Sequence, residues 1–177
     1  MRQIRDIYMA TIKKGRAYHL IDEKDKIKTA QELKRVIKPN GILIVAGISL
    51  FGVIRTVLIR YPEELIDEKH DEVFESGIHR VSIHEYDGES FPDAFFWKPL
   101  ELKEFLEEQG FETLEMAACE GIFSHLREAV NEVSKDRRKW HKIIELAIKT
   151  SNDPTIIGST EHFLWIGKNR DPKMNSI

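Results

Sequence analysis

Few residues in this chain have the types and spacing that catalysis or metal binding requires. His79 and His84 flank the segment RVSI and stand apart from other ligand residues, so we expect no metal site there. The run DEKHDE at residues 67–72 places carboxylates around a histidine, a pattern typical of a solvated helix face. The motifs G-x-G-x-x-G, Walker A, H-E-x-x-H and G-x-S-x-G are absent from the sequence. We therefore expect neither a phosphate loop nor a zinc site.

Two isolated residues remain candidates for acid–base or nucleophilic chemistry. His162 opens the last predicted strand and is either a structural histidine or a general base. Ser49 follows a predicted strand, where a hydrolase places its nucleophile, but no glycine pattern surrounds it. The single cysteine, Cys119, lies in an apolar strand-like context, which favours a packed thiol. An unrelated hydrolase is therefore a disfavoured interpretation.

An aromatic cluster follows in the segment SFPDAFFWKP, with Phe91, Phe95, Phe96 and Trp97 close together. One interpretation is a satellite core beneath a long loop. The other is one wall of an apolar substrate pocket, because aromatic rings supply much of the contact area in small-molecule sites. The residues themselves leave both alternatives open.

Local signals define the elements that must position these residues. Asp22 is a candidate N-cap for a helix over residues 22–37, and Pro39-Asn40-Gly41 makes a turn into an apolar strand over residues 42–48. A short strand over residues 4–12 precedes that helix, and this spacing predicts a right-handed parallel crossover. Downstream we expect helical segments broken at Pro62 over 49–77, an irregular aromatic stretch over 79–99, a helix over 99–109, a strand over 111–118, helices near 122–132 and 135–150, and a strand over 161–168.

Composition limits the class of protein. The 177 residues are 41% hydrophobic and 32% charged, which is typical of one globular domain. The net charge of −3 gives no indication of a nucleic-acid partner, and no polybasic block or long apolar run indicates a membrane. One cysteine and the absence of a signal-peptide pattern predict a cytoplasmic protein.

The order of these pieces resembles the C-terminal half of a class I S-adenosylmethionine-dependent methyltransferase core. The matching segments are GRAYHLIDEKDKIKTAQELKRVIKPNGILIVAG, FFWKPLELKEFLEEQGFETLEMAACEGI and EHFLWIGKN, which together cover most of residues 15–170. The resemblance implies an α/β fold: a truncated Rossmann-like sheet of parallel strands with helices on both faces. Its last strand would run antiparallel and insert between residues 42–48 and 111–118. It also implies one domain over residues 1–170 with an insertion at about 49–98, and a loose tail at 171–177.

The resemblance also implies site residues and partners. S-adenosylmethionine would contact Gly15, Tyr18, His19 and Leu20, although a simple loop before a helix is the alternative for this segment. A small-molecule substrate would contact Ser49, Phe51, Phe95, Phe96 and Trp97, and His162 would be the candidate base. The family's glycine-rich loop and ribose-binding acidic residue have no counterpart in the sequence.

Two hypotheses follow from the absence of the family's glycine-rich loop and ribose-binding acidic residue. The chain is either a small-molecule methyltransferase with an incomplete cofactor site, or an inactive methyltransferase-like remnant or partner subunit that dimerises through an exposed sheet edge. A homo-oligomer or a complementing chain is expected in either case, and a truncated reading frame is a related possibility.

Overall fold

The computed structural model describes residues 19–66, 68–80 and 92–170, with the side chain of residue 69 excepted. Its first helix, α1 (Glu23–Val36), leads through the turn at Asn40, whose φ is 63°, into strand β1 (Ile42–Ile48). Asp22 occupies the N-cap position of α1 without a side-chain hydrogen bond. The predicted strand over residues 4–12 and the tail at 171–177 lie outside the described residues.

The segment after β1 is helical and ends in a small hairpin. It contains α2 (Leu50–Arg60), the 3₁₀ turn η2 (Pro62–Ile66), and α3 (Lys69–Ser76). Strands β2 (Ile78–His79) and β3 (Ala94–Phe95) then pair antiparallel. As the sequence indicates, Pro62 separates the two longer helices, because proline cannot continue a helix.

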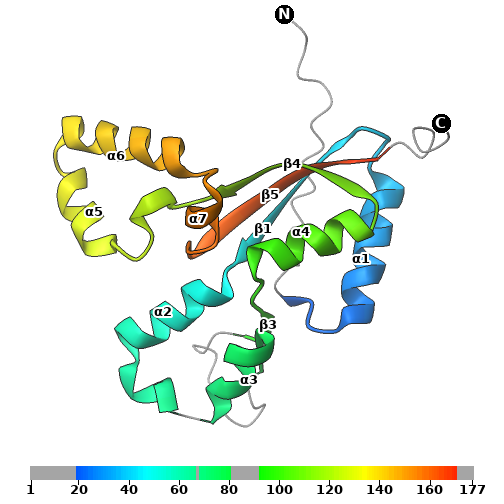
Figure 1. Cartoon of the computed structure of the whole chain (residues 1–177), viewed down its shortest axis with the longest axis horizontal. Helices are drawn as coiled ribbons and strands as arrows, with labels where there is room; N and C mark the ends of the chain where they lie inside the picture. The colour runs from blue at the N-terminus through cyan, green and yellow to red at the C-terminus, as the bar shows by residue number, and fades with distance from the viewer. Residues whose placement is uncertain (1–18, 67, 81–91, 171–177) are drawn as a thin grey trace, which may run out of the picture.

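The rest of the described chain contains two long strands and the helices between them. Helix α4 (Pro99–Glu108) ends before Gly110, whose φ of 86° makes it the left-handed residue that lets the chain turn into β4 (Phe111–Ala118). The 3₁₀ turn η3 (Gly121–Phe123) and the helices α5 (Arg127–Ser134), α6 (Arg137–Thr150) and α7 (Pro154–Ile157) follow, before strand β5 (His162–Asn169). Figure 1 shows α5 and α6 extending away from the sheet.

The main sheet has the order β1-β5-β4, and β5 runs antiparallel to both neighbours. The expected position and direction of the last strand are therefore observed. The expected parallel, Rossmann-like sheet is wrong, because every ladder between the described strands is antiparallel. β1 and β4 run in the same direction but do not touch, since β5 lies between them. The one parallel contact among described residues is an isolated bridge between Ser49 and Trp97.

Helices α1 and α4 pack on one face of this sheet. The core on that face joins α1 and α4 to alternate residues of the strands: Ile37, Leu43, Trp97, Leu102, Leu106, Phe111, Phe163 and Trp165. On the opposite face β1 presents Ile42, Ile44 and Ala46, and none of these three side chains is buried, while Ile48 packs against the cluster of Leu50, Val73, Ala94 and Phe96. We call this second surface the open face.

Candidate functional site

Three chain segments meet where β1 and β4 end and β5 begins. The Ser49 N–H donates to the Glu161 carbonyl at 2.9 Å, and the Cys119 N–H donates to the His162 carbonyl at 2.9 Å. Because β5 runs opposite to its neighbours, its first residue lies at the same end of the sheet as their last residues. His162 is therefore brought beside the loop that follows β4.

Glu120, in that loop, forms a tightly fixed pair with His162. Its Oε1 lies 2.7 Å from His162 Nδ1, while its Oε2 accepts hydrogen bonds from Thr160 Oγ1 at 2.7 Å and from the His162 N–H at 3.1 Å. Thr160 is fully buried, so this carboxylate has little freedom to turn. With Nδ1 donating to Glu120, the other ring nitrogen, Nε2, is the one available to exchange a proton.

The electrostatics of the pair favour a charged histidine and a charged carboxylate. The hydrogen bond with Glu120 raises the pKa of His162, against an opposing effect of burial. Burial acts to raise the pKa of Glu120, but its hydrogen bonds with His162 and Thr160 outweigh burial, and the pKa is lowered. Since the His162 side chain is 53% exposed, its Nε2 is accessible to a small molecule. In its neutral form, a histidine held by a carboxylate in this way binds a proton more tightly, which suits it to act as a general base.

A second histidine–glutamate pair fastens the neighbouring loop to the start of β5. The His125 N–H donates to Glu161 Oε2 at 3.1 Å, and the Glu161 N–H donates to Ser124 Oγ at 2.9 Å. His125 has a φ of 65°, and its side chain is only 10% exposed with a buried, unpartnered Nε2. Burial is the main cause that lowers the pKa of His125, against an opposing effect of Glu161, which favours the neutral imidazole. We assign His125 a positioning role.

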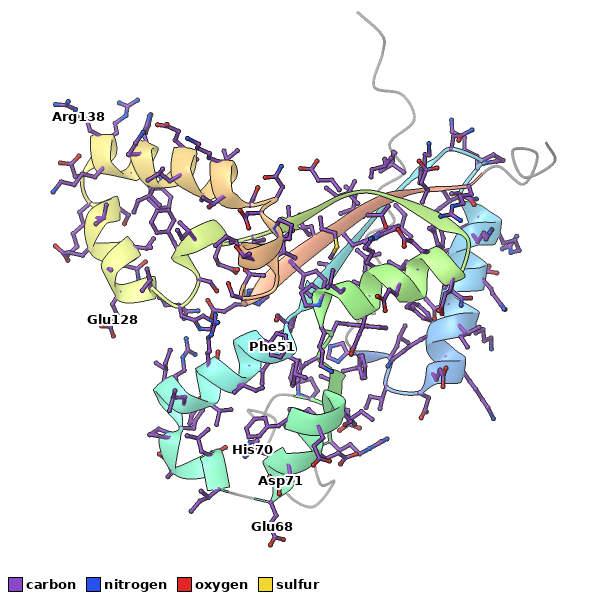
Figure 2. The ribbon with its side chains drawn as sticks, viewed as in Figure 1. Phe51, Glu68, His70, Asp71, Glu128 and Arg138 are labelled. Atoms are coloured by element: carbon purple, nitrogen blue, oxygen red, sulfur yellow. The ribbon has the colours of Figure 1, made fainter. Side chains whose placement is uncertain are left out.

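The predicted substrate-wall residues lie near this end of the sheet, but most of them are packed in the interior. Ser49, Phe96 and Trp97 are buried, at 0%, 6% and 6% exposure. Ser49 Oγ and Trp97 Nε1 are buried without hydrogen-bond partners. Phe95 is partly buried, and Phe51 is exposed at the start of α2 (Figure 2). Phe95, Phe96 and Trp97 of the aromatic cluster thus serve mainly as core, whereas Phe91 lies outside the described residues.

An unexpected cation lies against two of these rings. Lys26 Nζ, from α1, is 2.9 Å from the centroid of the Phe95 ring and 4.9 Å from that of Trp97. Burial lowers the pKa of Lys26 to about 8, although Glu23 and Glu101 oppose the shift. Lys26 lies on the buried face of α1, four residues before Ala30 and eleven before Ile37.

The predicted cofactor residues are only half described. Gly15 and Tyr18 lie outside the described residues, while His19 Nδ1 is 2.9 Å from the Asp93 carbonyl oxygen. Leu20 lines a groove of about 490 Å³ along α1 together with Leu33 and Val36. His19 is thus held by the segment before β3, whereas Leu20 belongs to a groove on α1.

Other candidates carry little chemistry. Cys119 is exposed as a residue, contrary to the packed thiol expected, and its pKa is raised to about 11 by burial of the sulfur and by Glu120. Such a thiol is a weak nucleophile at neutral pH. Within residues 19–66, 68–80 and 92–170 we find no group of three side chains arranged to bind a metal. In the same ranges, no helix has the length and apolar character needed to cross a membrane.

Sequence reasoning identified His162 but missed Glu120 and His125. Glu120 is separated from His162 by 42 residues, and only the pairing of β4 with β5 brings the two together. A usable signal existed, because Glu120 lies two residues after the predicted strand 111–118 and strand ends commonly carry functional residues. Comparison with known proteins gives no further guidance, since neither a family model nor a curated protein matches the sequence.

Proposed function

We propose that this chain provides the acceptor side of an S-adenosylmethionine-dependent methyltransferase that acts on a small molecule. The observation that carries the proposal is the Glu120–His162 pair, which holds an accessible imidazole at the end of the sheet where Ser49, Phe51 and Trp97 also lie. The order of the sequence motifs and the insertion of the last strand between β1 and β4 support it.

His162 would act on the acceptor. Its Nε2 would remove the proton from an acceptor hydroxyl or amine, and Glu120 would stabilise the resulting imidazolium through Nδ1. Base catalysis of this kind contributes about 10²–10⁴-fold to a rate. The cofactor would supply the methyl group. Residues besides His19 and Leu20 would be needed to hold the cofactor.

The proposal is tested by binding and transfer measured separately. Calorimetric titration with S-adenosylhomocysteine should give a saturable signal for the wild-type chain and for His162→Gln, since His162 is assigned to the acceptor. Transfer of labelled methyl from S-adenosylmethionine to a panel of small phenols and amines should fall about 10²-fold or more in His162→Gln. The absence of heat at millimolar S-adenosylhomocysteine would count against the methyltransferase.

A second candidate function is that of a non-catalytic partner subunit which associates through its sheet edge. The observation in its favour is that the outer edge of β1 forms no ladder with any other described strand. This candidate predicts a dimer in solution together with no response to S-adenosylhomocysteine. The two measurements therefore separate the candidates.

A further inference from the structure

The two edges of the main sheet differ in how well they are protected from pairing. The β4 edge carries Glu112 and Glu115, and its register shifts between Thr113 and Glu115. Charges and bulges of this kind keep edge strands from adding another strand. The sequence of β1, ILIVAGI, contains no charge and no proline, and its register with β5 is unbroken. Only the β1 edge is therefore suited to receive a strand.

Backbone hydrogen bonds define the part of the β1 edge that is free. The Trp97 N–H donates to the Ile48 carbonyl at 3.0 Å, and the Leu50 N–H donates to the Trp97 carbonyl at 3.1 Å, so Trp97 occupies one end. The N–H and C=O of one strand residue point to the same edge, and this direction alternates along the strand. The residues that share the direction of Ile48 are Ile42, Ile44 and Ala46.

Among the described residues, no group bonds to the outward-facing N–H and C=O of these three residues. Apart from the β5 ladder, no hydrogen bond of Ile42, Ile44 or Ala46 is found within the described ranges. Their side chains project onto the open face, where Ile42 and Ile44 are partly exposed and Ala46 is exposed. Leu164 and Ile166 of β5 continue this apolar surface and are also only partly buried.

We propose that a second copy of this chain pairs antiparallel with β1 about a two-fold axis at Ile44, giving a continuous sheet in the order β4-β5-β1-β1-β5-β4. The free window from Ile42 to Ala46 is symmetric about Ile44, so Ile42 would face Ala46 of the partner subunit. Ile44 would face Ile44 of the partner subunit. This interface specifies the partner for the second candidate function and does not depend on methyl transfer.

Self-complementarity favours a second copy over an unrelated strand. A two-fold axis opposes each residue of the window to another apolar residue of the same window, so no like charges meet. The open faces of the two copies would then form one apolar surface across the interface. The same operation at β4 would bring glutamates of the two copies close together, which disfavours pairing there.

A cysteine placed at the axis tests the register. In a Cys119→Ser background, Ile44→Cys should give a disulfide-linked dimer on mild oxidation, because hydrogen-bonded antiparallel pairs have Cα atoms about 5.5 Å apart, within disulfide range. The matched control is Ala46→Cys, whose two copies would lie about 13 Å apart along the strand and should stay unlinked. The Ile42→Cys, Ala46→Cys double variant should link again. Equal linking of the two single variants would overturn the register.

Light scattering after size exclusion tests the interface itself. The wild-type chain should elute with the mass of a dimer, and Ile44→Lys should shift to a monomer because two lysines would meet at the axis. Leu114→Lys, on β4 and 49% exposed in the native chain, is the matched control and should remain a dimer. A wild-type monomer would overturn the proposal and assign the edge to another occupant, such as residues 1–18 or a different protein.

Two further outcomes separate this inference from the proposed methyltransferase. A cross-linked dimer that does not bind S-adenosylhomocysteine would support the β1 interface and contradict the proposed methyltransferase. A monomer that binds S-adenosylhomocysteine would support the methyltransferase and contradict the interface. If circular dichroism shows that Ile44→Lys does not fold, the cross-linking of the cysteine variants still tests whether the interface forms.

Discussion

At the residue scale, two charged groups are governed by their surroundings more than by their sequence neighbours. His162 is charged more readily because Glu120 faces its Nδ1, and Lys26 is charged less readily because it is buried against aromatic rings. Each shift has a consequence that can be measured.

Replacing Glu120 by Gln should lower the pKa of His162 toward its ordinary value of about 6.5, because the amide removes the negative charge at Nδ1. The chemical shift of the imidazole protons, followed by NMR against pH, measures this directly. Thr155→Val, in α7, is a surface control that should leave the His162 titration unchanged. An unaltered titration in Glu120→Gln would show that the pair is not formed in solution.

The same pair should make stability depend on pH. Since the folded-state pKa of His162 is raised, its contribution is full below its unfolded pKa and is lost as pH rises through the raised value. Since the folded-state pKa of Glu120 is lowered, its contribution is full above its unfolded pKa and is lost as pH falls through the lowered value. The contribution of the Glu120–His162 pair to the free energy of unfolding is therefore greatest between the two unfolded pKa values, at about pH 4.5–6.5. Urea unfolding of the wild type and Glu120→Gln across this range should differ by about 1 kcal/mol or less, because His162 is half-exposed.

Lys26→Met should stabilise the protein at neutral pH. The folded-state pKa of Lys26 is about 8, below the unfolded value, so the charged amine is penalised by folding below pH 8. Wild-type stability should therefore rise as pH increases from about 8 to 10.5, and the variant should lack this component of the rise. Denaturant unfolding at pH 8 and pH 10.5 measures the free energy of unfolding of both proteins.

Lys28→Met, on the exposed side of α1, is the matched control. A large destabilisation in Lys26→Met would instead show that the contact of its amine with the rings dominates.

At the scale of elements, two glycines allow aromatic rings to lie flat on the covered face of the sheet. Gly47 pairs with Phe163, and a Cβ added at Gly47 would lie 2.4 Å from the end of that ring. A Cβ at Gly167 would lie 2.1 Å from the Trp165 ring. These contacts explain how two large buried side chains fit on one strand.

Gly47→Ala should destabilise the protein by about 1–3 kcal/mol, the usual cost of overpacking a filled core. Gly158→Ala is the control, because its nearest neighbour would lie at an ordinary 3.4 Å, and its cost should stay within about 0.5 kcal/mol. Urea midpoints at constant m-value measure both. Equal midpoints would mean that the Phe163 ring relaxes without cost.

At the scale of the whole molecule, stability is distributed unevenly. One core joins α1 and α4 to the sheet, and a second joins α2 and α3 to β3 through Leu50, Val73, Ala94 and Phe96. Helices α5 and α6 contain no buried residue, and Trp140, Ile144 and Ile148 are exposed along one side of α6. Figure 2 shows Glu128 in the first turn of α5 and Arg138 in the first turn of α6.

Amide hydrogen exchange should therefore be fast in residues 127–150 and slow in β5, which lies between two strands and buries alternate side chains. Mass spectrometry of peptides from the two regions measures the difference. Equal protection of both regions would indicate that another surface covers α5 and α6 in solution.

The sequence alone determined the elements more completely than their arrangement. Strands 42–48 and 111–118 were placed at their observed bounds, because proline, glycine and apolar runs act within a few residues. The site was predicted only in part: His162 was identified, whereas Glu120 and Lys26 were not, because their roles depend on contacts with distant segments.

Tertiary structure decided which strands pair and which groups become unusual. The predicted crossover between residues 4–12 and 42–48 lies partly outside the described residues, and the observed ladder of β1 is with β5, more than a hundred residues away and antiparallel. Local spacing specifies that a strand forms, whereas its partner is selected by the burial and backbone pairing of the whole chain. For the same reason, a glutamate and a histidine from opposite ends of the helical segment between β4 and β5 became one candidate acid–base pair.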